Sequence, residues 1–315
     1  MDIADIITEF GAYYLGPSQE ANRSRIVQQL FQAAVTAALF TTMVTDATIY
    51  RASEARIGKL LQPFQKAWTP RGEAQFVPIA IEQFKMKADL EEYPDDLEAT
   101  WLGFLADNSL DRKTWPFVRW FVESLVIPQI KEDEELDLIY NGVYAAPTPG
   151  TAGAVGTSMD GLGKIIADQI TAGRITPITL GAIDADDKLF VKQVEDFVDQ
   201  INSLYRNAPM TLGLSETLER RYLRGYRELY GKDTDYAGAK RKVDFTNITM
   251  QGLPSMAGKS RIWCSPKSNL VRLTKKTGIQ TPRIENVDRK VKLYTDYWQG
   301  VGMLIPEIFF CNELV

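Results

Sequence analysis

Apolar and polar residues alternate along two neighbouring stretches in the first third of the chain. Apolar side chains recur at every second position from Val77 to Ile81 and again from Phe84 to Leu90, with one slip of phase near Glu82 and Gln83. An alternation of period two predicts β-strands, and the slip predicts a β-bulge. Pro and Gly in "TPRG" (69–72) favour a turn, so the sequence predicts a long hairpin over residues 49–90.

The sequence beside this hairpin offers no partner for its large side chains. Trp68 precedes the turn signal, and Phe76 and Val77 follow it. An isolated two-stranded hairpin is marginally stable in water, so its apolar face requires a cover. The pattern alone does not identify that cover.

Helical spacing is seen in most of the remaining apolar positions. A stripe from Ile26 to Leu39 predicts a helix over residues 18–44 that begins at Ser18, and residues 95–106 form a second, shorter helix. Residues 117–142 predict the longest helix, which is apolar nearly all round at its start, is kinked or interrupted at Pro128 and ends at Gly142.

The second half of the chain mixes both periodicities. Residues 145–163 are rich in Gly, Ala, Thr and Pro and predict a loop between domains. The helices and strands predicted after it are helices at 159–172, 186–206 and 215–230, and strands at 243–250, 260–264 and 289–311, the last turning at Gly300–Gly302. The fold class is therefore α+β. Ahead of the first helix, Phe10, Tyr13 and Tyr14 indicate an N-terminal arm that docks on a surface.

Composition narrows the class of protein. The chain has 315 residues, 45% of them hydrophobic and 24% charged, which fits one large or two medium globular domains. No apolar run approaches the roughly 20 residues of a membrane-spanning helix, and the first ten residues lack the basic region of a signal peptide. These features predict a protein made and used in a cytoplasm, without a membrane partner.

The residue types present argue against catalysis. The sequence contains no histidine, which removes Ser-His and Cys-His nucleophiles and the commonest metal ligand. Cys264 and Cys311 lie in apolar runs and are predicted to be buried, reduced thiols. "GTSMDGLGKII" (156–166) departs from a phosphate-binding loop, because Ser158 stands for the first Gly and Ile165 follows Lys164. We predict no enzyme activity, no cofactor and no metal site.

Two acidic runs, 91–96 and 132–137, leave one catalytic alternative open. Acidic runs are mostly solvated faces or helix caps, and Asp95 and Asp96 complement the N-terminus of the following helix. A carboxylate-dependent enzyme would instead bind a divalent metal through residues 91–98 or 132–137, and would lose it when Asp95 and Asp96 become Asn.

Charge is distributed unevenly along the chain, although the net charge is only −5. Residues 89–137 contain 14 acidic and 4 basic side chains, a balance of −10, and residues 240–292 contain 13 basic and 3 acidic ones, a balance of +10. The two segments are either solvated faces or complementary patches that meet within or between subunits.

A basic and aromatic segment, "LERRYLRGYRELYG" (218–231), has two interpretations. Its tyrosines at 222, 226 and 230 share one helical face, which favours packing. Basic residues interleaved with aromatics also occur in nucleic-acid sites. Contact with DNA or a neighbouring subunit therefore stays open for four arginines, namely Arg220, Arg221, Arg224 and Arg227.

The order of these elements resembles the major capsid proteins of tailed double-stranded DNA phages, the Hong Kong 97-type fold. Two stretches strengthen the resemblance: "ITMQGLPSMAGKSRIWCSPKSNLVRLTKKTG" (248–278), similar to an axial-domain passage, and "YWQGVGMLIPEIFFCNEL" (297–314), similar to the closing strands. The resemblance implies an N-terminal arm and helix (1–48), an extended hairpin loop (49–92), a peripheral domain with a spine helix (93–148), an axial domain (149–284), and C-terminal strands that return to the peripheral domain (285–315).

The resemblance also implies a cover for the hairpin, because a neighbouring subunit supplies it in this family. The expected contact residues are Trp68, Pro70, Arg71, Phe76 and Val77 at the hairpin tip, and Phe10, Tyr13 and Tyr14 in the arm. Some relatives crosslink through a lysine of this loop, but no motif singles out a Lys–Asn pair here. The chain reaches the hairpin within about fifty residues, so scaffolding is expected to be a separate protein or absent.

The function implied is a shell protein that forms hexamers and pentamers of an icosahedral head. Its expected partners are other copies of the chain, a portal, scaffolding or decoration proteins, and packaged DNA through weak non-specific contact. It would be located in the virion and assembled in the bacterial host cytoplasm. An encapsulin-like nanocompartment is the alternative on the same fold, and the carboxylate-dependent enzyme is the alternative of another class.

Overall fold

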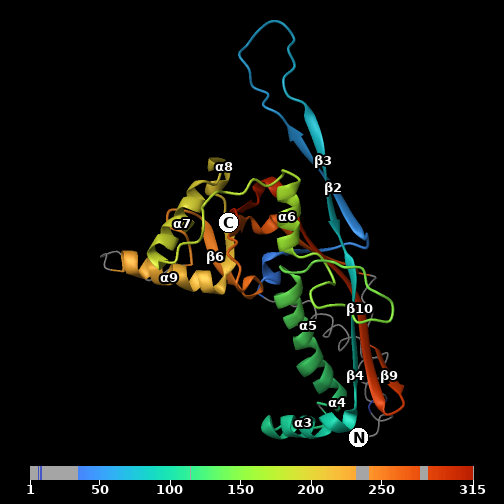
Figure 1. Cartoon of the computed structure of the whole chain (residues 1–315). Helices are drawn as coiled ribbons and strands as arrows, with labels where there is room; N and C mark the ends of the chain where they lie inside the picture. The colour runs from blue at the N-terminus through green and yellow to red at the C-terminus, as the bar shows by residue number, and fades with distance from the viewer. Residues whose placement is uncertain are drawn as a thin grey trace.

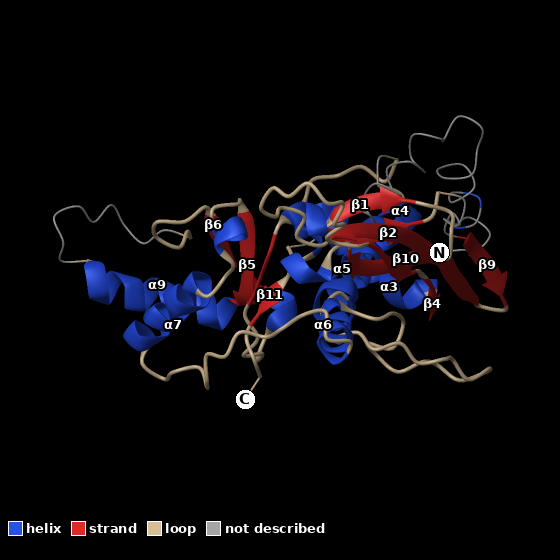
Figure 2. Ribbon diagram, turned by 90° about the horizontal axis from the view of Figure 1, so that it is seen from above, coloured by secondary structure: helices blue, strands red, loops and turns tan. Residues whose placement is uncertain are grey.

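A computed structural model of the chain describes Ile6, Thr8 and residues 35–113, 115–231, 241–276 and 283–314, with the backbone alone at 54–56, 74–75 and 286–287. The molecule is elongated, and a β-hairpin projects from its body at one end (Figure 1). Seen from above, a sheet with α7 and α9 lies at one end and a second sheet with the hairpin at the other, with α5 and α6 between them (Figure 2). Helices and strands alternate irregularly along the chain, which confirms the α+β class.

The described strands are β1 (Thr41–Val44), β2 (Ile49–Ile57), β3 (Ala74–Glu82), β4 (Phe84–Glu92), β5 (Met210–Ser215), β6 (Ile248–Leu253), β7 (Trp263–Ser265), β8 (Leu270–Thr274), β9 (Arg283–Val287), β10 (Lys290–Met303) and β11 (Phe310–Cys311). The described α-helices are α3 (Pro94–Asp107), α4 (Phe117–Trp120), α5 (Ile127–Asp133), α6 (Leu162–Thr171), α7 (Asp187–Asp199), α8 (Ser203–Arg206) and α9 (Glu216–Tyr230). Short 3₁₀ turns lie at 37–39, 254–256, 267–269 and 306–308.

The larger sheet has the strand order β1-β8-β10-β4, and β9 also pairs with β10. Strand β10 runs unbroken for 14 residues, so the predicted turn at Gly300–Gly302 is wrong. The two glycines serve a close approach instead, because a Cβ at Gly300 would overlap the carbonyl oxygen of Glu82 and one at Gly302 would lie 2.6 Å from Ile81. Strand β3 crosses β10 at this point.

Strands β2 and β3 form the predicted hairpin, paired antiparallel from Ile49↔Glu82 to Ile57↔Ala74. The predicted slip of phase at Gln83 is confirmed, but its cause is a change of partner rather than a bulge, because β4 beyond it pairs with β10. Gln83 fixes the change by donating its backbone N–H to the Thr48 carbonyl at 2.8 Å. Its side-chain amide donates to the carbonyls of Thr45 and Ala47 at 3.0 and 2.9 Å.

The predicted helix over 18–44 lies mostly outside the described residues. Its described end is wrong, because Thr41–Val44 forms strand β1 and pairs in parallel with β8. Three of these four residues are β-branched at Cβ, which favours a strand where a partner is available.

The predicted long helix extends from Phe117 to Leu138, through α4 and α5 and two π-helical segments at Phe121–Val126 and Glu134–Leu138. Pro128 does not interrupt it. The turn before the proline is widened, as shown by the bond from the Ile127 N–H to the Val122 carbonyl. Such a widened turn re-arranges the backbone hydrogen bonds where a proline has no N–H to donate.

The smaller sheet has the order β11-β7-β5-β6, and α7 and α9 pack beside it. Helices α3, α6, α7 and α9 confirm the predicted ones, with α7 and α8 replacing a single helix at 186–206. Strand β6 begins five residues later than predicted and β7 three residues later, while β5, β8 and β9 were not predicted.

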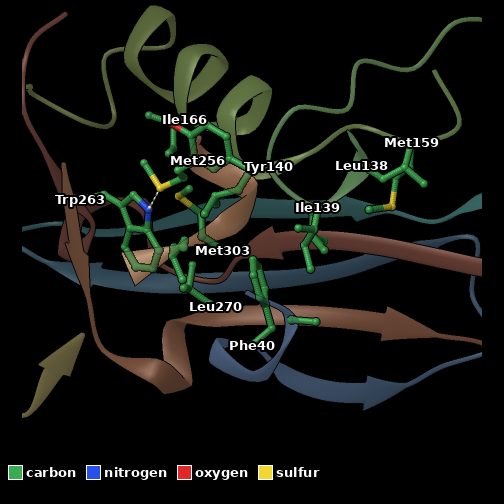
Figure 3. Close-up of a cluster of buried hydrophobic side chains, with 14 of the residues drawn as sticks. Phe40, Leu138, Ile139, Tyr140, Met159, Ile166, Met256, Trp263, Leu270 and Met303 are labelled. Atoms are coloured by element: carbon green, nitrogen blue, oxygen red, sulfur yellow. Dashed lines mark hydrogen bonds between the residues drawn. The ribbon is translucent and has the colours of Figure 1, made fainter. Parts of the chain in front are cut away.

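Four groups of buried apolar side chains hold these parts together. The first joins the end of the long helix, α6 and both sheets, and Figure 3 shows Tyr140, Ile166 and Met303 converging within it. The Trp263 indole N–H donates to the Met256 sulfur there at 3.2 Å. This group is continuous from sheet to sheet, and the base of the hairpin rests on a separate group, in which Ile79 and Ile81 pack against β8.

We expect Ser215→Ala to lower the free energy of unfolding by about 1 kcal/mol, the usual cost of losing an N-cap. The buried Ser215 hydroxyl accepts the Leu218 N–H at 3.3 Å at the start of α9. Ser203→Ala is the control, because exposed Ser203 follows Asn202, whose side chain caps α8. Urea unfolding of both variants measures the difference, and equal midpoints would contradict the role of the cap.

Candidate functional site

The loop that closes the hairpin, residues 58–73, is far longer than the tight turn predicted at 69–72. It is held by its own side chains: the Gln62 amide donates to the Thr69 carbonyl at 2.6 Å, and the Arg71 guanidinium donates to the Leu61 carbonyl at 3.3 Å. Gly72 has φ +86°, a left-handed conformation that glycine adopts without strain. These bonds cross the loop and give it an ordered form.

The tip of this loop exposes large apolar side chains. Leu61, Phe64 and Trp68 are 93%, 92% and 91% exposed. Burying each in a contact would contribute roughly 1.5–3 kcal/mol. Leu61 and Phe64 were missed from the sequence, because the loop has no periodicity that would single them out.

The other predicted hairpin contacts lie along the same projection. Pro70, Arg71 and Phe76 are exposed, and Val77 is half-buried. The structure therefore gathers all five residues of the predicted contact on the distal half of the hairpin.

The proximal half of the hairpin has a partner in its own chain, which corrects the expectation that a neighbour covers all of it. Ile79 and Ile81 are buried against Val271 and Leu273 of β8. These partners lie about 190 residues further along the sequence, and among the described strands β3 packs against β8 without pairing with it. Only the distal half lacks a cover among the described residues.

The arm residues Phe10, Tyr13 and Tyr14 lie outside the described residues. Ile6, which is described, is buried in the core around Trp101 and Phe117.

The four arginines of α9 do not act alike. Arg221 donates to the Asp187 carboxylate at 2.7 Å and to the Asp184 carbonyl, and Arg224 lies 3.6 Å from Asp187. Arg220, Arg224 and Arg227 are exposed, whereas Arg221 is partly buried. Arg221 therefore ties α9 to the start of α7, and the other three face solvent.

The tyrosines of α9 pack as their spacing predicted. Tyr222 is fully buried and Tyr226 nearly so, in the core between α7, α9 and the smaller sheet. The Tyr226 hydroxyl donates to the Asp244 carboxylate at 2.6 Å.

A buried ion pair joins the long helix to the larger sheet, and it corrects the prediction that residues 132–137 are solvated. The Arg272 guanidinium lies 2.7 Å from the Glu134 carboxylate, with side chains only 3% and 8% exposed. Gln299 on β10 donates to the same carboxylate at 2.7 Å and accepts from Arg272 at 3.2 Å. Burial raises the pKa of Glu134 above its ordinary value, and Arg272 and Gln299 oppose that rise.

The neighbouring Glu135 is also buried, where its carboxylate accepts the backbone N–H of Thr36 at 3.0 Å and the Thr36 hydroxyl. Ser255 lies 2.7 Å from that hydroxyl. The signal for the buried acids was present in the sequence, because Glu134 continues the helical stripe of Ile127, Ile130 and Leu138.

The oppositely charged segments meet within the chain. Besides Glu134 and Arg272, Glu91 on β4 pairs with Lys290 and, at 3.3 Å, with Lys292 on β10. Of the two readings, complementary patches thus hold for these residues. The exposed Glu91 pairs contribute little to the free energy of unfolding. Removing one partner of the buried Glu134–Arg272 pair would cost far more, because it would leave a buried charge unpaired.

The remaining chemistry-bearing residues form no assembled centre within the described ranges. There, no three acidic or cysteine side chains converge as a metal site would require. Cys264 and Cys311 are buried free thiols, as predicted, and burial raises the pKa of both. The described helices include none with the length and apolarity needed to span a bilayer.

Comparison with known proteins gives structural matches only. No protein-family model and no curated protein matches the sequence. A chain from the procapsid of satellite phage P4, in a structure that includes the size determination protein, matches with a TM-score of 0.56 and 12% identity, over 92% of this chain and 98% of that one. The capsid of an empty GTA particle gives 0.55 and 12%, over 90% of each chain.

A third match is the capsid of Myoviridae phage XM1, with a TM-score of 0.50 and 11% identity over 89% of this chain and 92% of that one. At these identities the likeness concerns the fold. The fold is thus shared along nearly the whole chain. This protein has the fold of tailed-phage major capsid proteins.

Proposed function

We propose that this protein is the major capsid protein of a tailed double-stranded DNA phage, assembling into the hexamers and pentamers of an icosahedral head. The single observation that carries the proposal is the projecting loop with Leu61, Phe64 and Trp68 exposed, in a chain with the capsid fold. A monomeric protein rarely presents such side chains together on a projection, because they favour association and aggregation. A shell in which a neighbouring copy covers them removes that cost.

The structurally similar chains support the proposal through the particles from which they come, a satellite phage procapsid and an empty GTA particle. For this chain we propose the division into arm (1–48), hairpin loop (49–92), peripheral domain (93–148), axial domain (149–284) and closing strands (285–315). The proposed location is the virion, after assembly in the host cytoplasm.

The proposed partners besides the chain itself are a portal, scaffolding or decoration proteins, and packaged DNA. The arm residues Phe10, Tyr13 and Tyr14 are proposed as a further contact between copies. Exposed Arg220, Arg224 and Arg227 are proposed to contact a neighbouring copy or DNA, because they lie on one outer face of α9. Arg221 is a weaker candidate, since it is partly buried and donates to both Asp187 and the Asp184 carbonyl, whereas Arg224 stays exposed beside Asp187.

The test is assembly of a Phe64→Ser/Trp68→Ser variant. We expect the wild-type chain at high concentration to form closed shells under negative-stain electron microscopy, and the variant to form at most a tenth as many. The variant should unfold at the wild-type midpoint, because both side chains lie outside the core.

Val155→Ser is the matched control, since Val155 is an exposed apolar residue on a different loop. It should assemble like the wild-type chain. Shells formed equally by the double variant, or small discrete oligomers of the wild-type chain in every assembly condition, would contradict the proposed function.

A further inference from the structure

A groove of about 310 Å³ lies at the base of the hairpin, between β3 and α6. Its apolar lining includes Ile165 of α6 and Val301 and Met303 of β10, and its charged lining consists of Glu82, Asp160, Asp168 and Arg174. These four side chains sum to −2. The volume lies at the low end of the range seen for binding pockets.

One wall of the groove is the free edge of a strand. Residues 78–82 of β3 line it in succession, and among the described strands β3 pairs only with β2. The Gln83 N–H donates to the Thr48 carbonyl, one residue before β2 and in line with the β2–β3 ladder. Backbone groups at odd-numbered positions of β3 therefore face β2, and those at even-numbered positions face away from it. Pro78, which lacks an N–H, occupies an outward position as this alternation requires.

The groove therefore presents hydrogen-bonding groups as well as apolar surface. Outward backbone groups of Ala80 and the Pro78 carbonyl can pair with an added extended segment. On the opposite wall, the Oε1 of Gln169 is buried and accepts no hydrogen bond from the described residues. An occupant that brings donors and apolar side chains fits this site.

The loop 58–73 has the complementary chemistry. It carries Lys59, Lys66 and Arg71 against Glu73, a sum of +2, together with Phe64 and Trp68, whose indole N–H is a donor. Its backbone is unpaired over most of its length, apart from the bonds that cross the loop. The charges of the loop and the groove are opposite, and both combine apolar with polar surface.

The loop 58–73 cannot reach the groove of its own chain. The nine-residue ladder of β2 and β3 holds the loop at the far end of the hairpin from the groove (Figure 1). We propose that the groove between β3 and α6 receives the loop 58–73 of a second copy of this chain. The inference rests on the proposed shell function and names the receiving surface for its contact. Each copy then offers one loop and one groove, and such a head-to-tail contact generates a ring when the rotation between copies closes.

Cysteine crosslinking tests the pairing. Ala67→Cys places a thiol on the loop and Ala80→Cys one in the groove, both at exposed positions, while Cys264 and Cys311 are buried. The two variants are mixed, assembled and oxidised, so that a disulfide between position 67 and position 80 must join two chains. We expect non-reducing electrophoresis to show the linked pair at least ten-fold above a mixture of Ala67→Cys with Ala182→Cys, an exposed control position.

Each variant alone controls for like-with-like linkage, and mass spectrometry of the linked peptides identifies the joined positions. Shells that form without a 67–80 link above the control overturn the groove assignment and leave the proposed function intact. A wild-type chain that never forms shells overturns both.

A measurement on the unmodified protein decides the case in which a cysteine variant fails to fold. Hydrogen exchange is compared between unassembled chains and shells. We expect the amides of the loop and of Ala80 to exchange at least ten-fold more slowly in shells. Equal exchange rates at Ala80 in both states would overturn the assignment.

Discussion

Arg272→Met is expected to lower the free energy of unfolding by about 3–5 kcal/mol, the range found when one member of a buried ion pair is removed. The substitution removes the charged partner of the buried Glu134 carboxylate and leaves the Gln299 amide donating to it. It also separates the long helix from β8, because the pair joins those two elements. Urea unfolding followed by circular dichroism measures the loss.

The matched variants separate charge from packing. Glu134→Gln/Arg272→Met should recover at least about 2 kcal/mol of the loss, because it removes the uncompensated charge and keeps a hydrogen-bonding group near Gln299. Arg220→Met at the exposed pair with Glu216 should cost less than about 1 kcal/mol. If the double variant is as unstable as Arg272→Met, the loss comes from packing and the electrostatic account is wrong.

The same pair gives a pH dependence with a definite sign. Burial raises the folded-state pKa of Glu134 above the ordinary 4.5, and loss of Arg272 raises it further because the opposing charge is gone. A carboxyl whose pKa is raised in the folded state contributes its full stability to the fold at pH values below its unfolded-state pKa. That contribution is lost as the pH rises through the folded-state pKa. The cost of Arg272→Met should therefore be smaller near pH 4.5 than at pH 7.5, and a cost that shrinks with rising pH would contradict it.

Elements whose signals are local were predictable from the sequence. Helix α9 begins at the Ser215 cap and ends before Gly231, as its sequence indicates, and the alternation from Val77 to Ile81 predicted β3. Of the exposed apolar side chains at the hairpin tip, the sequence predicted Trp68 and missed Leu61 and Phe64, again because only local signals can be recognised. Trp68 flanks a turn signal, whereas Leu61 and Phe64 lie in an irregular loop that only the structure shows to be exposed.

Elements decided by distant partners were not predictable. Strand β1 reads as the end of a helix because its partner, β8, lies some 230 residues away, with Thr41 opposite Val271. Glu134 was predicted as part of a solvated acidic run, although it continues a helical stripe, because its charged partner Arg272 lies 138 residues away. In both cases a long-range contact overrides the local pattern.

The division of the hairpin into a covered base and an exposed tip links stability to the proposed assembly. The base is fixed by Ile79 and Ile81 against β8 and by the crossing of β3 over β10. If the base were loosely held, orienting the tip in a contact between copies would cost entropy and weaken that contact. Rigidity at the crossing is therefore part of what the proposed contact between copies requires.

Gly300→Ala is the substitution that tests this crossing. Its Cβ would overlap the Glu82 carbonyl and lie 3.2 Å from the Gln83 Cα, both backbone atoms that no rotamer change can move. We expect a loss of about 3 kcal/mol in the free energy of unfolding, the upper part of the range for overpacking. Chemical denaturation measures it, and microscopy under conditions in which the variant is folded should show fewer closed shells, because the base of the hairpin has shifted.

Gly103→Ala is the matched control, since a Cβ at Gly103 in the middle of α3 meets nothing within 4 Å. There the same substitution should raise the free energy of unfolding by up to about 1 kcal/mol, because alanine is the better helix former. Opposite signs at the two glycines would assign the cost at Gly300 to the crossing strand and not to the chemistry of the substitution. If Gly300→Ala is as stable as the wild-type chain, the crossing yields easily, and the tip must owe its position to the neighbouring copy instead.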